Sequence, residues 1–232
     1  MNRFLISALC LAILAGCHNS GIRGFWNNVP LLEKELPKSE NRFADFAELA
    51  VSAPLEVALS EMDNLFNLLT QDEVAYYIYS EWMDKAFYNP FSPCRNASIY
   101  SKAVERMVSD GILSMDDCAP YLRHRDWINY NLTGQKAVVP GVSLSGERTL
   151  ILVLDLGCPS CREAIDRLSS NPEWDGFRKI AIGMGIGPEP ATEGWEYYHP
   201  DNAQAVFDIS VSPVYFTVSQ SGEVDIPYTP AI

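Results

Sequence analysis

Residues 149–161 read TLILVLDLGCPSC and contain the strongest indication of the fold. The first part of this stretch, Thr149–Leu154, is a continuous apolar run, which is typical of a strand buried on both faces of a sheet. Cys158 and Cys161 follow closely, and Pro159 between them favours the first turn of a helix, where its missing N–H costs no hydrogen bond. The stretch therefore predicts a buried strand, a turn that holds two cysteines, and a helix.

The position of these cysteines suits disulfide exchange. Such exchange needs a thiolate nucleophile, and unpaired N–H groups together with the helix dipole lower the pKa of a thiol at a helix N-terminus. We therefore expect Cys158 to be the nucleophile and Cys161, one turn later, to be the resolving thiol. The alternatives are half of a zinc site, which would need two further ligands, and a merely structural disulfide.

The segments around this stretch read as the rest of an α/β domain. Lys179–Ile182 is a second short apolar run of the buried-strand type. Val214–Val218 and Glu223–Ile226 flank a turn that contains glycine, so they read as a hairpin. Ala137–Leu144 reads as a broken strand or a hairpin. This order of elements predicts a mixed sheet with flanking helices over residues 131–232.

The preceding part of the chain reads as helical, and we predict an all-α domain over residues 37–130. Leu55–Leu69 contains an apolar stripe at helical spacing. Thr70–Glu73 is a capping-box signature, which predicts a helix with Val74 and Trp82 on its apolar face.

The first residues indicate export. Phe4–Ala15 is apolar but too short to cross a bilayer comfortably, and residues 14–17 read LAGC. This pattern resembles the bacterial lipobox, which implies removal of residues 1–16, lipidation of Cys17 and a tether over residues 17–36. Several acyl chains give a stable anchor, so we expect the chain on a periplasm-facing membrane of the cell envelope. The alternative is an ordinary signal peptide.

The composition limits the partners. Asp and Glu number 30 and Lys and Arg 17, which gives a net charge of −13. Such a chain repels phosphate backbones, so nucleic acid is not an expected partner, and no metal or cofactor is predicted. Cysteines can persist as disulfides outside the cytosol. Cys94 and Cys118 are therefore predicted to form a structural disulfide, with two free thiols as the close alternative.

Residues Val138–Ile226 resemble the thioredoxin family. The resemblance rests on the buried strand, the C-P-S-C at a helix start, and a Ser-Pro pair before a later strand. In that family a cis-proline faces the two cysteines. The resemblance implies that Pro213 is cis and shields the cysteines from metals, and that the backbone of Ser212 pairs with an extended substrate. It also places Pro159 and Ser160 among the substrate contacts.

The chain departs from the family pattern at several positions. The family has a buried aspartate where this chain has Leu152, and a tryptophan where it has Gly157. The nearest carboxylate is that of Asp155, which is expected to be solvated. Only six residues follow Ile226 (232 − 226 = 6), so the C-terminal helix is expected to be absent. We expect Ala137–Leu144 or the helical half to cover the bare sheet face instead.

Residues 87–96, FYNPFSPCRN, resemble a segment of bacterial thioredoxin-like lipoproteins that have a helical domain before the thioredoxin domain. The resemblances imply a membrane-anchored thiol–disulfide oxidoreductase that acts on protein thiols and disulfides and receives electrons from an upstream envelope donor. A reductant is the first expectation, and an oxidase or isomerase the second. The alternative class is a non-catalytic binding or adaptor lipoprotein. A peroxidase would need a peroxide-binding constellation that the sequence does not offer.

Overall fold

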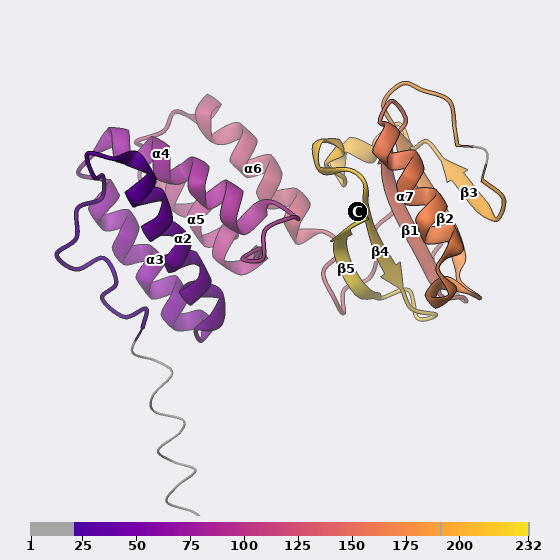
Figure 1. Cartoon of the computed structure of the whole chain (residues 1–232), viewed down its shortest axis with the longest axis horizontal. Coiled ribbons are helices and arrows are strands. Elements are labelled where there is room, and N and C mark those ends of the chain that lie inside the picture. Colours follow the sequence, from indigo (N-terminus) through magenta and orange to yellow (C-terminus); the bar gives the residue numbers. More distant parts are fainter. Residues whose placement is uncertain (1–20, 191, 232) are drawn as a thin grey trace, which may run out of the picture. The chain divides into compact units, whose positions relative to one another are not determined.

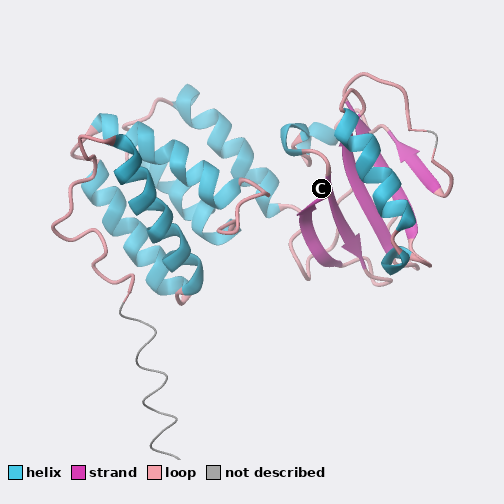
Figure 2. Cartoon of the chain, in the orientation of Figure 1, coloured by secondary structure: helices cyan, strands magenta, loops and turns pink. Residues whose placement is uncertain are grey.

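The computed structural model describes residues 21–190 and 192–231. The predicted signal peptide and Cys17 lie outside these residues. The chain forms two compact units, one running to Tyr121 without residues 89–91, and one made of those three residues and the chain from Leu122 onward. Helices make up residues 36–129, and every strand follows them (Figure 2). Within the described ranges, no helix has both the length and the apolar character that a membrane span requires.

The helical region confirms the predicted all-α part of the fold. Its elements (Figure 1) are α2 (Leu36–Ser52), α3 (Leu55–Leu69), α4 (Glu73–Met83), the π-helix η1 (Asp84–Tyr88), α5 (Ala97–Ser109) and α6 (Met115–Asn129). Three of these helices begin at side chains that accept hydrogen bonds from free N–H groups. Asp72 accepts from Ala75 at the start of α4, Asn96 accepts from Ser98 and Ile99 at the start of α5, and Ser114 accepts from Asp117 at the start of α6.

The start of α4 corrects one detail of the predicted apolar face. The cap is Asp72 and not Thr70, so the helix begins two residues later than expected. Val74 is 64% exposed, while Tyr76 and Tyr79 are fully buried. Each residue turns a helix by about 100°, so side chains three or four positions apart share a face. Tyr76 and Tyr79 are three positions apart and therefore both face the core, wherever the helix begins.

The expectation of a tether over residues 17–36 is wrong for residues 21–36, which pack against the helices. Ile22 and Trp26 are buried, and the Trp26 ring lies 5.2 Å from that of Phe46 and 5.7 Å from that of Tyr79. The Tyr79 hydroxyl also donates a hydrogen bond of 2.8 Å to the Leu31 carbonyl. Burial of an indole removes a large apolar surface from water, and this favours a segment that folds back onto the helices.

The sheet confirms the predicted mixed arrangement. Its strands are β1 (Thr149–Asp155), β2 (Arg178–Met184), β3 (Trp195–Tyr198), β4 (Val214–Val218) and β5 (Val224–Pro230), in the order β3-β2-β1-β4-β5. β1 is parallel to β2 and antiparallel to β4. The remaining helices are α7 (Pro159–Ser170), η2 (Pro172–Trp174), η3 (Ala203–Ala205) and η4 (Ile209–Val211). The sequence did not predict β3, which is only four residues long.

An apolar layer covers each face of the sheet. α7 packs on one face, where Leu150 and Leu152 of β1 meet Ile165 (Figure 1). On the other face, Val139 and Leu144 join the apolar cluster of the strands. The segment between these two residues forms no strand, which corrects the predicted broken strand or hairpin. It does cover the face of the sheet opposite α7.

A bulge in β5 places Val224 and Ile226 on opposite faces of the sheet, although the two residues alternate with polar residues in the sequence. Val224 packs on the Leu144 side, whereas Ile226 packs on the α7 side. Val218 pairs with Val224, and the adjacent Thr217 pairs with Ile226, so one extra residue lies on β5. An extra residue reverses the side-chain alternation beyond it. The Thr217 hydroxyl accepts the N–H of Ile226 at 3.1 Å.

Candidate active site

The turn after β1 places Cys158 at the start of α7. The Asp155 carboxylate accepts a hydrogen bond from the N–H of Gly157 at 2.9 Å. The Asp155 carbonyl accepts from the N–H of Cys158 at 3.1 Å, and Leu156 donates to the Met184 carbonyl of β2 at 2.9 Å. Asp155 therefore shapes the turn through its own side chain, a role beyond that of the solvated carboxylate expected.

Cys158 has the surroundings of a nucleophile. It is the N-cap residue of α7 and is partly exposed. Its sulfur lies 3.2 Å from the Ser160 hydroxyl. The Ser160 hydroxyl lowers the pKa of Cys158 most, and hydrogen bonds from Cys161 and from the first N–H groups of α7 lower it further. Because hydrogen bonds to a sulfur favour its charged form, Cys158 is the more readily ionised thiol of the pair.

Cys161, in contrast to Cys158, is buried and has a raised pKa. Its side chain is 1% exposed, and burial raises its pKa to about 11, with a further contribution from its hydrogen bond to Cys158. The Cys161 thiol donates to the Ser212 hydroxyl at 3.8 Å, and that hydroxyl donates to the Ile209 carbonyl at 2.8 Å. At neutral pH, Cys161 is therefore a buried, protonated thiol, whereas Cys158 is partly exposed and ionises more readily.

Strand pairing brings Pro213 to the same end of the sheet. β4 runs antiparallel to β1, and Val214 at its start pairs with Val153 near the end of β1. The Ser212–Pro213 peptide bond is cis, as the family resemblance predicted. The Cys161 thiol contacts Ser212 directly. The site thus combines the turn after β1 with the loop before β4.

The polar neighbour of Cys161 differs from the family pattern. Leu152 is fully buried in the apolar layer under α7, so it offers no proton acceptor. The Ser212 hydroxyl is the hydrogen-bond partner of Cys161 instead. The family resemblance implied only a backbone role for Ser212. The contact of its side chain with Cys161 was not predicted, because no local pattern connects two residues 51 positions apart. Within the described ranges, no three His, Cys, Asp or Glu side chains are grouped to hold a metal ion.

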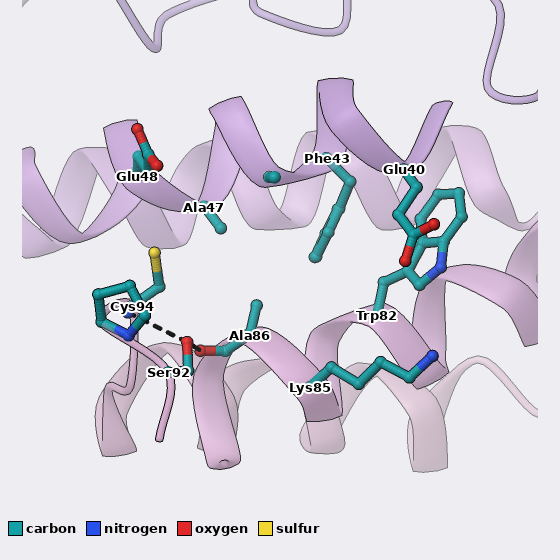
Figure 3. A pocket seen from close by; sticks show the side chains of 11 residues that line it. Glu40, Phe43, Ala47, Glu48, Trp82, Lys85, Ala86, Ser92 and Cys94 are labelled. Carbon is teal, nitrogen blue, oxygen red and sulfur yellow. Dashed lines mark hydrogen bonds between the residues drawn. The ribbon is translucent and has the colours of Figure 1, made fainter. Parts of the chain in front are cut away.

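The predicted disulfide between Cys94 and Cys118 is wrong. Both are free thiols in the structure. Cys118 donates a hydrogen bond of 3.6 Å to the Met107 carbonyl of α5, whereas Cys94 faces Glu48 of α2 (Figure 3). Burial raises the pKa of each thiol. The two cysteines belong to different contacts of the helical unit, in agreement with the alternative of two free thiols.

Cys94 lies at one end of a pocket of about 240 Å³ between α2 and η1. Figure 3 shows its sulfur pointing into the space below α2. The Ser92 hydroxyl donates to the Ala86 carbonyl of η1 at 2.6 Å and accepts the N–H of Cys94 at 3.1 Å. The segment that resembles bacterial thioredoxin-like lipoproteins, residues 87–96, therefore ties one wall of this pocket to the π-helix. The apolar lining includes Phe43, Ala47 and Trp82.

A comparison with solved structures finds a thioredoxin-like protein from Bacteroides caccae. Its TM-score is 0.70 at 17% sequence identity, and the match covers 90% of this chain and 87% of that chain. The chain therefore has a thioredoxin-like fold, as residues 138–226 predicted. At this identity the likeness shows the fold alone. No protein-family model and no curated protein matches the chain.

Proposed function

We propose that this chain is a membrane-anchored thiol–disulfide oxidoreductase of the bacterial envelope that acts on protein substrates through Cys158 and Cys161. The observation that supports this most is the unequal state of the two thiols. Cys158 is accessible and has a lowered pKa, while Cys161 is buried with a pKa raised to about 11. A structural disulfide would not need such a difference, whereas attack and resolution do.

The proposed reaction is a two-electron reduction of a substrate disulfide. The Cys158 thiolate attacks one sulfur, the substrate S–S bond breaks, and the departing sulfur takes up a proton. Cys161 then loses its proton and attacks the Cys158 sulfur. This step releases the second substrate thiolate, which is protonated, and leaves a Cys158–Cys161 disulfide. An envelope dithiol donor returns two electrons and two protons. The same steps in reverse give an oxidase.

Turnover tests this proposal. The wild-type protein is expected to accelerate reduction of insulin disulfides by dithiothreitol in proportion to its concentration, because Cys158 attacks faster than a free thiol of ordinary pKa. Cys158→Ser is expected to return the rate to that of dithiothreitol alone. Cys94→Ser is the matched control, since Cys94 lies in the helical unit, and it is expected to retain the full rate.

The competing function is that of an adaptor that uses the fold without turnover. A wild-type rate equal to the dithiothreitol background would establish that alternative. The direction of the reaction follows from the reduction potential of the cysteine pair, which titration in glutathione buffers measures, with a tenfold change in equilibrium constant for each ~30 mV. A potential well below that of the glutathione buffer supports the proposed reductant, and one well above it an oxidase or isomerase.

The proposed anchor has its own test. Because LAGC at residues 14–17 follows an apolar segment, the protein extracted from membranes is expected to begin at Cys17 and to have the added mass of a diacylglyceryl group. Intact-mass spectrometry measures both. Cys17→Ala is expected to leave the chain unlipidated. An unmodified wild-type chain with another N-terminus would contradict the lipobox.

A further inference from the structure

The pocket between α2 and η1 lies wholly within the helical unit and takes no part in the proposed reaction. Its volume is about 240 Å³. An apolar cavity of ~150 Å³ is large enough to hold a benzene molecule, so this pocket has room for one substituted aromatic ring. The ring of Phe43 and the indole of Trp82 line it, and these side chains are only 3% and 6% exposed.

Small side chains and an irregular helix keep this space open. Ala44 and Ala47 of α2 and Ala86 of η1 line the pocket and fill little of it. η1 is a π-helix that directly follows α4, and such turns are rare and frequently occur at functional sites. The helical unit thus keeps a hollow with aromatic walls at a place where larger side chains would fill it.

One end of the pocket has a thiol without a partner. Cys94 is 7% exposed, and Figure 3 shows its sulfur pointing into the pocket. The other buried thiols, Cys118 and Cys161, each donate a hydrogen bond to an oxygen, whereas no described residue is a hydrogen-bond partner of the Cys94 sulfur. Buried polar groups usually have such a partner, so the Cys94 thiol is available to a bound molecule.

The opposite end of the pocket has two opposite charges. Figure 3 shows Glu40 and Lys85 at the end away from Cys94, near Trp82. Both side chains are exposed, and neither forms a salt bridge with a described residue. Glu40 attracts an ammonium group, which an indole ring also favours, and Lys85 attracts a carboxylate. A ligand that has both groups on one carbon would satisfy both charges.

We propose that the pocket binds a free α-amino acid with an aromatic side chain. The ammonium group of the ligand lies at Glu40 and its carboxylate at Lys85. Its ring extends along Phe43 toward Cys94, whose polarisable sulfur favours contact with an aromatic ring. A small side chain would leave the apolar wall in water, and an uncharged aromatic molecule would leave both charges unpaired. The site is separate from Cys158 and does not depend on the proposed oxidoreductase function.

Calorimetric titration of the purified protein with L-phenylalanine tests the site. Phenylalanine is expected to bind with a Kd of about 1 mM or lower, the range open to a ligand of this size. Phenethylamine lacks the carboxylate and 3-phenylpropanoate lacks the ammonium group. Each is expected to bind about fivefold more weakly, which is the size of effect that one exposed ion pair allows. Glycine, which has no ring, is expected not to bind.

Variants of the two charged residues test each end of the ligand separately. Lys85→Gln is expected to weaken phenylalanine binding about fivefold without weakening phenethylamine binding. Glu40→Gln is expected to weaken phenylalanine binding equally without weakening 3-phenylpropanoate binding. Glu56→Gln is the matched control, because it removes an exposed carboxylate outside the pocket, and it is expected to change neither affinity. Ala86→Leu is expected to abolish binding by filling the hollow.

Protection of Cys94 is the second measurement. At a phenylalanine concentration of about ten times Kd, alkylation of Cys94 by iodoacetamide is expected to slow about tenfold, because the occupied pocket covers the sulfur. Cys118 donates to the Met107 carbonyl outside the pocket and is the internal control, with an unchanged rate. A phenylalanine Kd above about 10 mM, equal affinities for the three ring compounds, or binding that leaves the Cys94 rate unchanged would overturn the inference.

Discussion

Cys161→Ala is expected to accumulate mixed disulfides with envelope proteins, and Cys158→Ser is expected to accumulate none. Cys158 is the accessible thiol with the lowered pKa, so we expect it to form the first covalent bond with a substrate. Cys161 is buried next to it, and we expect its thiol to break this bond. Without Cys161 the mixed disulfide has no internal route of release, and its lifetime depends on external thiols.

Non-reducing electrophoresis of intact cells, with mass spectrometry of the trapped bands, measures this difference. Cys94→Ser in the Cys161→Ala background controls for adducts through the helical unit and is expected to leave the bands unchanged. Adducts confined to Cys158→Ser would reverse the assigned roles. The absence of adducts from both variants would exclude a catalytic pair, and the trapped partners would identify the substrates.

Iodoacetamide is expected to modify Cys158 at least about 100-fold faster than Cys161 at pH 7. Only the thiolate reacts, and well below a pKa its fraction falls tenfold for each pH unit. The pKa of Cys161 is raised to about 11 and that of Cys158 is lowered from 9.0, so the two differ by more than two units. As the pH rises, the Cys158 rate should reach half of its maximum below pH 9, while the Cys161 rate should keep rising toward pH 11.

Timed alkylation of the reduced protein, followed by peptide mass analysis, gives both profiles. The Cys161 rate is measured in Cys158→Ser, so that modification of one thiol does not alter the other. Ser160→Ala should move the Cys158 plateau to higher pH, because the Ser160 hydroxyl contributes most to its lowered pKa. Superimposable profiles for the two cysteines would contradict the proposed division of roles.

Local sequence features were enough to predict β1, the cysteine turn and α7. The apolar run Thr149–Leu154 can bury both faces only inside a sheet, and Pro159 fits only the first turn of a helix at that point. These constraints act among neighbouring residues, so they can be read without the rest of the chain. The roles of Cys158 and Cys161 follow from the same local geometry and remain predictions about activity.

Contacts between distant segments were less accessible from the sequence. The residues around Trp26 read as a tether because the aromatic partners Phe46 and Tyr79 lie at least 20 positions further along the chain. Val224 and Ile226 alternate with polar residues, yet a single extra residue in β5 places them on opposite faces. The sequence allowed a disulfide between Cys94 and Cys118. In the structure Cys118 contacts α5 and Cys94 contacts α2, so each thiol has different neighbours.

The groups that surround the cysteine pair could not be predicted from the sequence, because they come from segments far apart in the chain. Antiparallel pairing of β1 and β4 brings Ser212 to Cys161, and close glycine packing sets Ile186 beside Gly157. Neither residue has a local pattern that marks it, because each depends on strand register and on backbone approaches between segments far apart in sequence. Local burial and the helix start therefore place Cys158, whereas long-range strand pairing determines which groups surround it.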